Sequence, residues 1–333
     1  VEGLAWARTR HVPVHVLGGG SNVVVADQGF DGLVIHVDIR GVARAPDDGR
    51  ETFSVGAGEP WDPFVAATVA AGCAGLECLS GIPGQVGGTP VQNVGAYGQD
   101  VSGSIIRVHV VDRETQTASI LTADECGFGY RTSRFKHHDR FIVSRVEFAL
   151  VPDGPPTLAY ADVITFFDEA GNSRPSLLEV RDAILGIRRR KGMVIEDGNP
   201  ANRSVGSFFV NPIITREHYA RLSPFHEIDW AAVPHYRVGA DRVKVPAAWL
   251  IERAGFPKGF TRGPIGVSPF QAQAILNHGG ARALDVLTLA ADIKHAVWQA
   301  FEIALVPEPI FVGFKAVPDL QWLLDAQPKG EER

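Results

Sequence analysis

The chain has 333 residues, of which 45% are hydrophobic, 9% aromatic and 21% charged. This composition excludes a disordered or fibrous chain, and the length suggests about two domains. Thirty-two basic and 38 acidic residues give a net charge of -6, so there is no overall positive field to hold a nucleic acid, and none is expected as a partner.

The first predicted elements are two short β-branched strands, 12–17 and 23–25, on either side of the sequence GGGSN at 18–22. The glycines do not form a GxGxxG dinucleotide fingerprint, because Val23 stands where the last glycine should be and a strand follows in place of a helix. Consecutive glycines can nonetheless direct successive backbone N–H groups into one concavity that binds phosphate. Two interpretations stay open: a diphosphate-binding loop, or a tight turn between strands.

A short helix and a second glycine-rich stretch are predicted next. Asp62 as N-cap and Pro63 at the first helical position mark the start of the helix, and Gly72 marks its end. The stretch 80–98 then holds six glycines in nineteen positions, more than a plain hairpin needs. So many residues without a side chain indicate either backbone laid against a flat, extended ligand or a long irregular surface loop.

The middle of the chain predicts a sheet followed by a helix. Three β-rich runs, 105–112, 118–122 and 141–150, are separated by short polar turns and indicate an antiparallel or mixed sheet. A helix is predicted after them, and Ser176 and Glu179 are spaced to form its capping box.

The last third of the chain predicts a separate lobe, which opens near a third glycine-bearing turn at 202–212. Apolar residues at steps of three and four, from Val286 to Ala304, mark one long amphipathic helix. The strand-like sequence IFVGF at 310–314 is expected to return to an earlier sheet.

Cysteine content and hydropathy bound the compartment. The three cysteines form no even framework and lack zinc-ligand spacing, so we expect no metal site and reduced core thiols at Cys73, Cys78 and Cys126. No apolar run approaches the roughly 18 residues that a membrane-spanning helix needs, and no leader peptide precedes Val1. We therefore expect a cytoplasmic protein without membrane insertion. Because the only methionine is Met193, the sequence is expected to start inside the natural protein.

Six sequences, in this order, resemble those of the UDP-N-acetylenolpyruvoylglucosamine reductase (UDP-N-acetylmuramate dehydrogenase) family: GGGSN, GLECLSGIPGQVGGTPVQNVGAYG, FGYRTSRFK, VGSFFVNP, WLIERAGFPKG and LVPEP. The resemblance covers nearly the whole chain. It implies an α+β protein in which an FAD-binding fold of the vanillyl-alcohol-oxidase (PCMH) type, in two subdomains, carries an α+β substrate-binding domain. The implied bounds are 1–37 for FAD-binding subdomain 1, expected to be incomplete at its N-terminus, 38–186 with 302–333 for FAD-binding subdomain 2, and 187–301 for the substrate-binding domain.

The resemblance also implies an activity. Such a flavoenzyme uses NADPH to reduce FAD, and hydride then passes from the flavin to the β-carbon of the enolpyruvyl ether of UDP-N-acetylglucosamine enolpyruvate, giving UDP-N-acetylmuramate for peptidoglycan. The expected partners are therefore the UDP-sugar and NADPH, in a monomer or weak oligomer. The residues that would bind FAD are Gly18, Gly19, Gly20, Ser21, Asn22, Gly81, Pro83, Gly84, Gly87, Gly88, Thr89, Gln92, Asn93, Gly95, Ala96 and Tyr97.

Three residues would carry the chemistry. Hydride addition at the β-carbon drives negative charge onto the substrate carboxylate, which Arg131 in FGYR would stabilise with a bidentate fork. Ser207 in GSFF would give a proton to the α-carbon, and Glu308 in PEP would act protonated or through water. By pattern alone, Arg131 could equally be a surface arginine, Ser207 a turn serine bonded to its own backbone, and Glu308 a solvated loop acid.

Four residues would bind the substrate diphosphate or its sugar: Tyr160, Lys191, Asn211 and Glu252. The resemblance implies that the loop around Tyr160 closes over the diphosphate. The pattern alone also allows Lys191 to compensate the charge at a helix C-terminus, and Tyr160 to be a packed aromatic.

Two other functions stay open on the sequence. An FAD oxidase of the same fold would share the glycine stretches but would not need GSFF or the C-terminal glutamate. A nucleotide-binding module without turnover would keep Lys191 and Asn211 but could dispense with Ser207, Arg131 and Glu308. The presence of all three favours catalysis.

Overall fold

The computed structural model describes residues 1–136, 138–222, 233–314 and 321–323. The chain forms two compact units: unit 1 comprises Val1–Ser21 and Asp31–Glu196, and unit 2 comprises Asn22–Phe30 and Asp197–Arg333. The division into three domains stays a prediction. Within the described ranges, no helix has the length and apolar character needed to cross a membrane.

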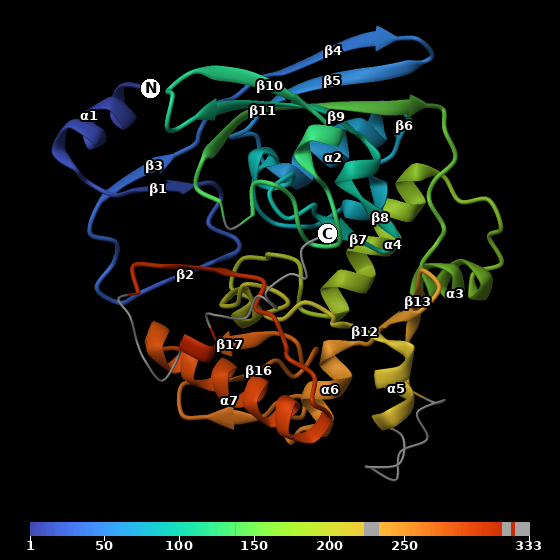
Figure 1. Cartoon of the computed structure of the whole chain (residues 1–333). Helices are drawn as coiled ribbons and strands as arrows, with labels where there is room; N and C mark the ends of the chain where they lie inside the picture. Colours follow the sequence, from blue (N-terminus) through green and yellow to red (C-terminus); the bar gives the residue numbers. More distant parts are fainter. Residues whose placement is uncertain (137, 223–232, 315–320, 324–333) are drawn as a thin grey trace. The chain divides into compact units, whose positions relative to one another are not determined.

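Unit 1 is built on a six-stranded antiparallel sheet (Figure 1). Because the three predicted β-rich runs are adjacent strands of this sheet, that prediction is confirmed. The main path runs through β10 (Ala118–Thr122), β9 (Ile105–Asp112), β11 (Phe141–Pro152), β5 (Arg50–Gly56) and β4 (Val42–Asp47), while β6 (Cys73–Ala74) pairs with the end of β11.

Helix α2 (Trp61–Ala70) packs on the sheet through an aromatic cluster. The rings of Phe64 and Trp61 lie 5.3 and 6.0 Å from that of Phe148 on β11, measured between centroids. The prediction of Asp62 as N-cap is wrong: Pro60 is the N-cap, and the Asp62 side chain bonds outside the helix. Asp62 lies inside the first turn, and its carboxylate bonds Gly81 and Arg181, which are distant in sequence.

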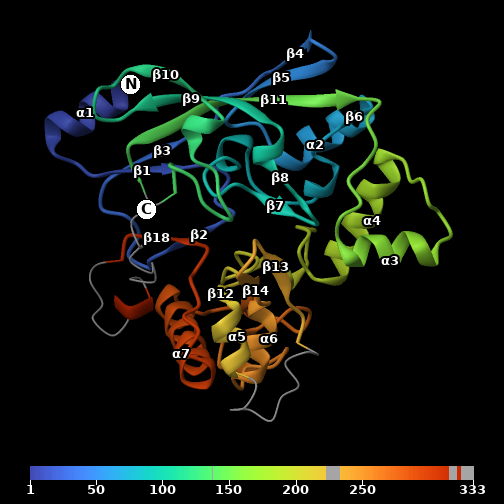
Figure 2. The ribbon, with the colours of Figure 1, turned by 45° about the vertical axis from the view of Figure 1, so that its right-hand side comes forward.

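Helix α4 (Leu177–Arg190) lies on the same side of the sheet as α2 (Figure 2). Its capping box between Ser176 and Glu179 is confirmed, with both reciprocal hydrogen bonds present. Helix α3 (Ala161–Glu169) packs beside α4. A separate parallel pair, β1 (Val14–Leu17) with β3 (Leu33–His36), carries helix α1 (Glu2–Arg10).

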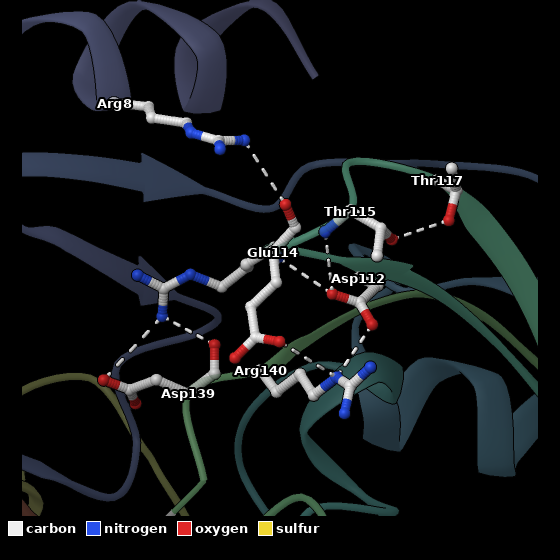
Figure 3. Close-up of polar contacts among 8 residues, drawn as sticks. Arg8, Asp112, Glu114, Thr115, Thr117, Asp139 and Arg140 are labelled. Atoms are coloured by element: carbon white, nitrogen blue, oxygen red, sulfur yellow. Dashed lines mark hydrogen bonds and ion pairs between the residues drawn. The ribbon is translucent and has the colours of Figure 1, made fainter.

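A polar cluster lies at the turn that follows β9 (Figure 3), and a hydrogen bond from Arg113 connects this turn to β1. The Arg113 guanidinium donates to the carbonyl oxygens of Val14 and Asp139, at 3.0 and 2.8 Å. The buried Asp112 carboxylate accepts from Arg140 Nε at 2.8 Å and from the backbone N–H of Glu114 at 2.8 Å. These contacts hold the small β1–β3 layer against the large sheet.

Asp62 anchors the second glycine stretch to α4. Its carboxylate accepts from Gly81 N–H at 2.6 Å and from both terminal guanidinium nitrogens of Arg181 at 2.7 and 2.9 Å. Burial acts to raise the pKa of Asp62, but the hydrogen bonds from Arg181 and Gly81, with the charges of Arg181 and Arg188, outweigh it and lower the pKa below 3.8.

We expect Asp62→Asn to lower the free energy of unfolding by about 1–2 kcal/mol at pH 7, since the pair is only partly buried. A carboxyl whose pKa is lower in the folded state stabilises above its unfolded-state pKa, and this stabilisation is lost as pH falls through the folded-state pKa. In urea denaturation, the difference from the wild type should therefore shrink as the pH falls below about 4. Asp168→Asn, on exposed α3 surface, is the control. A pH-independent difference would contradict the charge argument.

Within its described residues, unit 2 holds three small sheets, whose strands share one hydrophobic core with its helices. The predicted return of the C-terminal strand is confirmed, because β18 (Ile310–Val312) pairs in parallel with β2 (Val23–Val25). The other sheets are β12 (Ile213–Thr215), β14 (Arg242–Lys244) and β13 (Tyr236–Val238), and β15 (Thr261–Arg262), β16 (Ile265–Val267) and β17 (Ile275–Asn277).

Among its described residues, unit 2 also contains the helices α5 (Arg216–Leu222), α6 (Ala247–Arg253) and α7 (Ala283–Phe301). The long amphipathic helix is α7, but it ends earlier than predicted: Glu302 takes a left-handed conformation, with φ 53°, and Ala304 lies beyond the helix. Beyond the end Ile303 and Leu305 are buried, whereas Ala304 is exposed, so the helical spacing stops with the helix.

The three cysteines, Cys73, Cys78 and Cys126, are free and buried, as expected for core residues.

Candidate active site

The first glycine loop, 18–22, is not a turn between paired strands. Strand β1, before it, pairs with β3 in unit 1, whereas β2, after it, pairs with β18 in unit 2. The loop therefore passes from one unit to the other after Ser21. At Gly20 φ is 68°, a left-handed conformation that glycine adopts at little cost.

The two glycine stretches lie against each other within unit 1. A Cβ at Gly19 would stand 2.9 Å from Gly84 Cα, and a Cβ at Gly84 would stand 2.6 Å from Ser21 Oγ. Both distances are shorter than real Cβ contacts allow. Gly19 therefore needs glycine for close backbone approach, and Gly84 has a φ of 113°, which other residues rarely adopt. The structure thus brings together two loops that are more than sixty residues apart in sequence.

Two buried polar atoms beside these loops have no hydrogen-bond partner among the described residues: Gln85 Oε1 and Arg188 Nε. A Cβ at Gly18 would lie 3.4 Å from Gln85 Oε1, and one at Gly81 would lie 3.3 Å from Arg188 Nε. An isoalloxazine ring carries donors and acceptors on its edge, and a diphosphate accepts from backbone N–H groups. The residues present therefore fit FAD.

Other predicted FAD-binding residues fall into three groups. Thr89 Oγ1 donates to Val86 O at 2.8 Å, and Asn93 Nδ2 donates to Gly129 O at 3.0 Å, so these side chains shape the wall from within. At Gly88 a Cβ would meet no atom within 4 Å. Five more predicted residues are half-buried along the same stretch: Pro83, Gly87, Gln92, Gly95 and Ala96.

The Arg131 side chain packs against the second glycine stretch. Its Nη1 donates to Asn93 O at 3.5 Å, and its Nη2 donates to Gly95 O. The residue is half-buried, with φ 55° in the left-handed region. Its guanidinium is thus anchored to backbone carbonyl oxygens of the second glycine stretch, which does not fit a solvated surface arginine.

Tyr97, Tyr160 and Lys191 form one cluster. The two tyrosine rings meet edge to face with centroids 5.3 Å apart, and Lys191 Nζ lies 5.7 Å from the centroid of Tyr97. Lys191 also forms an ion pair with Asp162 Oδ2 at 2.8 Å. Burial raises the pKa of Tyr97, against the lowering effect of Arg188 and Lys191. Two predicted substrate residues therefore adjoin the last predicted FAD-binding residue.

Ser207 and Glu308 are neighbours in unit 2. Ser207 pairs with Ala274, and the next residue, Phe208, accepts at its carbonyl oxygen from Glu308 N–H at 2.8 Å. Asn22 Nδ2 donates to Glu308 O at 3.3 Å, so this predicted FAD-binding residue braces the glutamate backbone. The Ser207 hydroxyl makes no hydrogen bond within the part of the chain that the structure describes, contrary to the turn-serine alternative.

Asn211 and Glu252 differ in setting. Asn211 Oδ1 accepts from Ala247 N–H at 2.9 Å, at the start of α6, and from Gln273 Nε2 at 3.1 Å. Glu252 is exposed near the end of α6. The buried Gln273 was missed by the sequence analysis, although its backbone oxygen accepts from Phe208 N–H at 2.7 Å and its side chain holds Asn211.

A cavity of about 620 Å³ in unit 1 lies away from these residues. It adjoins the polar cluster of Figure 3, and none of the predicted site residues lines it. Its lining is Leu4, Arg8, Val12, Pro13, Val14, Arg113, Glu114, His138, Asp139 and Arg140.

Two parts of the chain match known domain families. Residues 1–119 match the FAD binding domain, and residues 199–312 match the C-terminal domain of UDP-N-acetylenolpyruvoylglucosamine reductase. The chain is thus an α+β FAD-binding protein with a reductase-type C-terminal domain.

Relatives identify the family. The UDP-N-acetylenolpyruvoylglucosamine reductase of Thermobifida fusca is 47% identical over 306 residues, covering 90% of this chain and 86% of the relative. That of Nocardia farcinica is 45% identical over 310 residues, covering 91% and 80%. The crystal structure of the reductase from Thermus caldophilus matches with a TM-score of 0.59 at 25% identity, covering 92% of this chain and 88% of that one. The chain belongs to the UDP-N-acetylenolpyruvoylglucosamine reductase family.

As a member, it is a flavoprotein oxidoreductase of UDP-N-acetylmuramate synthesis for peptidoglycan. The family, the fold class and the activity predicted from the sequence are confirmed. This assignment replaces the alternatives of an FAD oxidase and of a binding module without turnover.

Proposed function

We propose that NADPH is the reductant, that bound FAD carries the hydride, and that Arg131, Ser207 and Glu308 act on the enolpyruvyl ether of the UDP-sugar. The observation that carries this proposal is the close approach of the loops at Gly19 and Gly84, beside buried polar atoms that fit a flavin dinucleotide. When bound there, FAD supplies the hydride that reduces the substrate alkene.

Arg131 stabilises the charge that develops on the substrate carboxylate. A guanidinium has five N–H donors, and the carbonyl oxygens of Asn93 and Gly95 use only part of them. Because these bonds already fix the side chain, little reorganisation is needed when charge appears. The remaining N–H groups form the fork for the carboxylate oxygens.

Ser207 gives its proton to the α-carbon. Protonation of an enolate is downhill, so a positioned hydroxyl is an adequate donor even though an alcohol is a weak acid. The absence of a hydrogen bond from this hydroxyl within the described residues supports its availability. Glu308, held beside it through the backbone contact to Phe208, acts protonated or through water, because an ionised carboxylate would oppose the developing charge.

Tyr160, Lys191, Asn211 and Glu252 bind the UDP-sugar. Lys191 exchanges its ion pair with Asp162 for one with the diphosphate. Asn211 donates from its amide nitrogen to the substrate, while its side-chain oxygen still accepts from Ala247 N–H at the start of α6. We propose that the enzyme works as a monomer or weak oligomer in the cytoplasm, where nucleotide sugars and NADPH are available.

The visible spectrum tests the proposal. We expect the purified protein to show flavin absorption that NADPH bleaches anaerobically and that the enolpyruvyl UDP-sugar restores. Recovery with oxygen but not with the sugar would contradict the proposed substrate, and a protein that takes up no FAD would contradict the cofactor site. Bleaching by NADH as fast as by NADPH would contradict the proposed reductant.

A further inference from the structure

Glu77 is a fully buried carboxylate just before the second glycine stretch, in the 3₁₀ turn Glu77–Leu79. Its Oε2 accepts from Gly75 N–H at 2.8 Å, and its Oε1 accepts from Thr157 N–H at 2.8 Å and from Gln99 Nε2 at 3.1 Å. No ion pair holds it within the described parts of the chain. A buried carboxylate is costly unless N–H donors satisfy it, and here three do.

Gln99 completes the network. Its Oε1 accepts from Cys78 N–H at 2.9 Å, and its Nε2 donates to Thr157 Oγ1 at 3.1 Å as well as to Glu77. The Cys78 thiol lies 3.3 Å from Thr157 O as a further donor. Three segments far apart in sequence, around residues 77, 99 and 157, are therefore tied at one buried point.

The residues next to this point belong to the proposed site. Tyr97 lies two residues before Gln99, and Tyr160 lies three residues after Thr157. Their rings are in contact, with centroids 5.3 Å apart. The two segments that carry these tyrosines are packed tightly, since a Cβ at Gly98 would stand 2.8 Å from the Cβ of Ala159. The network thus fixes the base of the Tyr160 segment on the FAD-binding wall.

We propose that Glu77 is a positioning residue for substrate binding: it fixes the root of the Tyr160 segment and thereby sets affinity for the UDP-sugar. This inference rests on the proposed role of Tyr160 at the substrate diphosphate. A carboxylate is needed because both of its oxygens face N–H donors. In Glu77→Gln one end becomes an NH₂ group that opposes a donor, so the Thr157 or Gly75 contact must open.

The test uses FAD-loaded enzyme and two readouts: the Kd of UDP-N-acetylmuramate, titrated by the change in flavin absorption, and the limiting rate of flavin reduction at saturating NADPH. We expect Glu77→Gln and Tyr160→Phe each to raise Kd about 10-fold, the loss of one charge-assisted contact. The reduction rate should stay unchanged. The Kd of the double variant should be no higher than the higher Kd of the two single variants, because both changes act through Tyr160.

A milder variant covers the case in which Glu77→Gln does not fold. Thr157→Val removes only the hydroxyl that accepts from Gln99. It should raise Kd by a smaller factor and, like Glu77→Gln, leave the flavin reduction rate unchanged. Thr68→Val is the matched control: this residue is fully buried in unit 1, and within the described ranges its hydroxyl bonds only Val65 O of its own helix, at 2.8 Å. It should leave Kd unchanged.

Each other outcome overturns the inference in a recognisable way. Additive losses in the double variant, or an equal fall in the reduction rate, would mark Glu77 as merely structural. An unchanged Kd in Tyr160→Phe, beside a raised Kd in Glu77→Gln, would refute the role of Tyr160 in the proposed function and, with it, the route by which Glu77 is said to act. An unchanged Kd in Thr157→Val and Glu77→Gln would refute the positioning role alone.

Discussion

Replacement of Ser207 by alanine is expected to leave flavin reduction by NADPH nearly intact and to slow flavin reoxidation by the enolpyruvyl UDP-sugar by about 10²–10⁴-fold, the usual contribution of a general acid. The reason is that the hydroxyl serves only the second half-reaction, where the α-carbon takes its proton. Hydride transfer and proton transfer are coupled through the enolate. Loss of the Ser207 hydroxyl should therefore slow the oxidation of the flavin by the substrate.

Anaerobic stopped-flow absorption separates the two half-reactions. The same loop offers a control, because Ser204 Oγ donates to Ala201 O at 3.3 Å and accepts from Gly206 N–H at 3.3 Å. Ser204→Ala removes a serine that bonds its own backbone, so it should leave the reoxidation rate unchanged. If Ser207→Ala slowed both half-reactions equally, Ser207 could not be the proton donor.

Local sequence patterns predicted those elements whose cause is local. The capping box of α4 depends on two residues three positions apart, Ser176 and Glu179, and it is present. The role of Asp62 was wrongly predicted because its partner Arg181 lies 119 positions away. An N-cap pattern cannot reveal such a partner, and the distant ion pair prevailed over the local cap.

The site was predictable where glycine density carried the signal, and less so where single polar residues did. The density of glycine in two stretches indicated close backbone approach, but not that Gly19 and Gly84 approach each other. Gln273 is one polar residue in an irregular segment, and no periodicity distinguishes it. Glu77 offered a faint signal, an acid within the apolar run CAGLECL, which the family resemblance did not single out.

The sequence also does not indicate which side chains of the second glycine stretch bond the protein's own backbone. Thr89 and Asn93 carry groups able to bind a cofactor, and both were predicted to do so. In the structure their side chains donate to Val86 O and Gly129 O, as a turn-forming hydroxyl or amide often does, and their role at the cofactor stays a prediction. Whether such a side chain faces inward depends on backbone dihedral angles that residue identity does not determine.

Gly19→Ala is expected to weaken FAD binding about 10- to 100-fold, since overpacking at a tight contact costs about 1–3 kcal/mol. The new Cβ would stand 2.9 Å from Gly84 Cα, and backbone cannot yield as a side chain can. The two loops must separate, and the diphosphate would lose part of its N–H contacts. Fluorescence titration of the apoprotein with FAD measures the Kd.

Two further glycines separate a ligand effect from a folding effect. At Gly88 and at Gly103 a Cβ would meet no atom within 4 Å, but only Gly88 lies on the proposed FAD wall. Gly88→Ala should therefore weaken FAD binding without lowering the melting temperature of the apoprotein, and Gly103→Ala should change neither. Normal FAD affinity in both Gly19→Ala and Gly88→Ala would place the cofactor elsewhere, because the first change separates the two loops and the second adds a methyl group where the protein leaves open space.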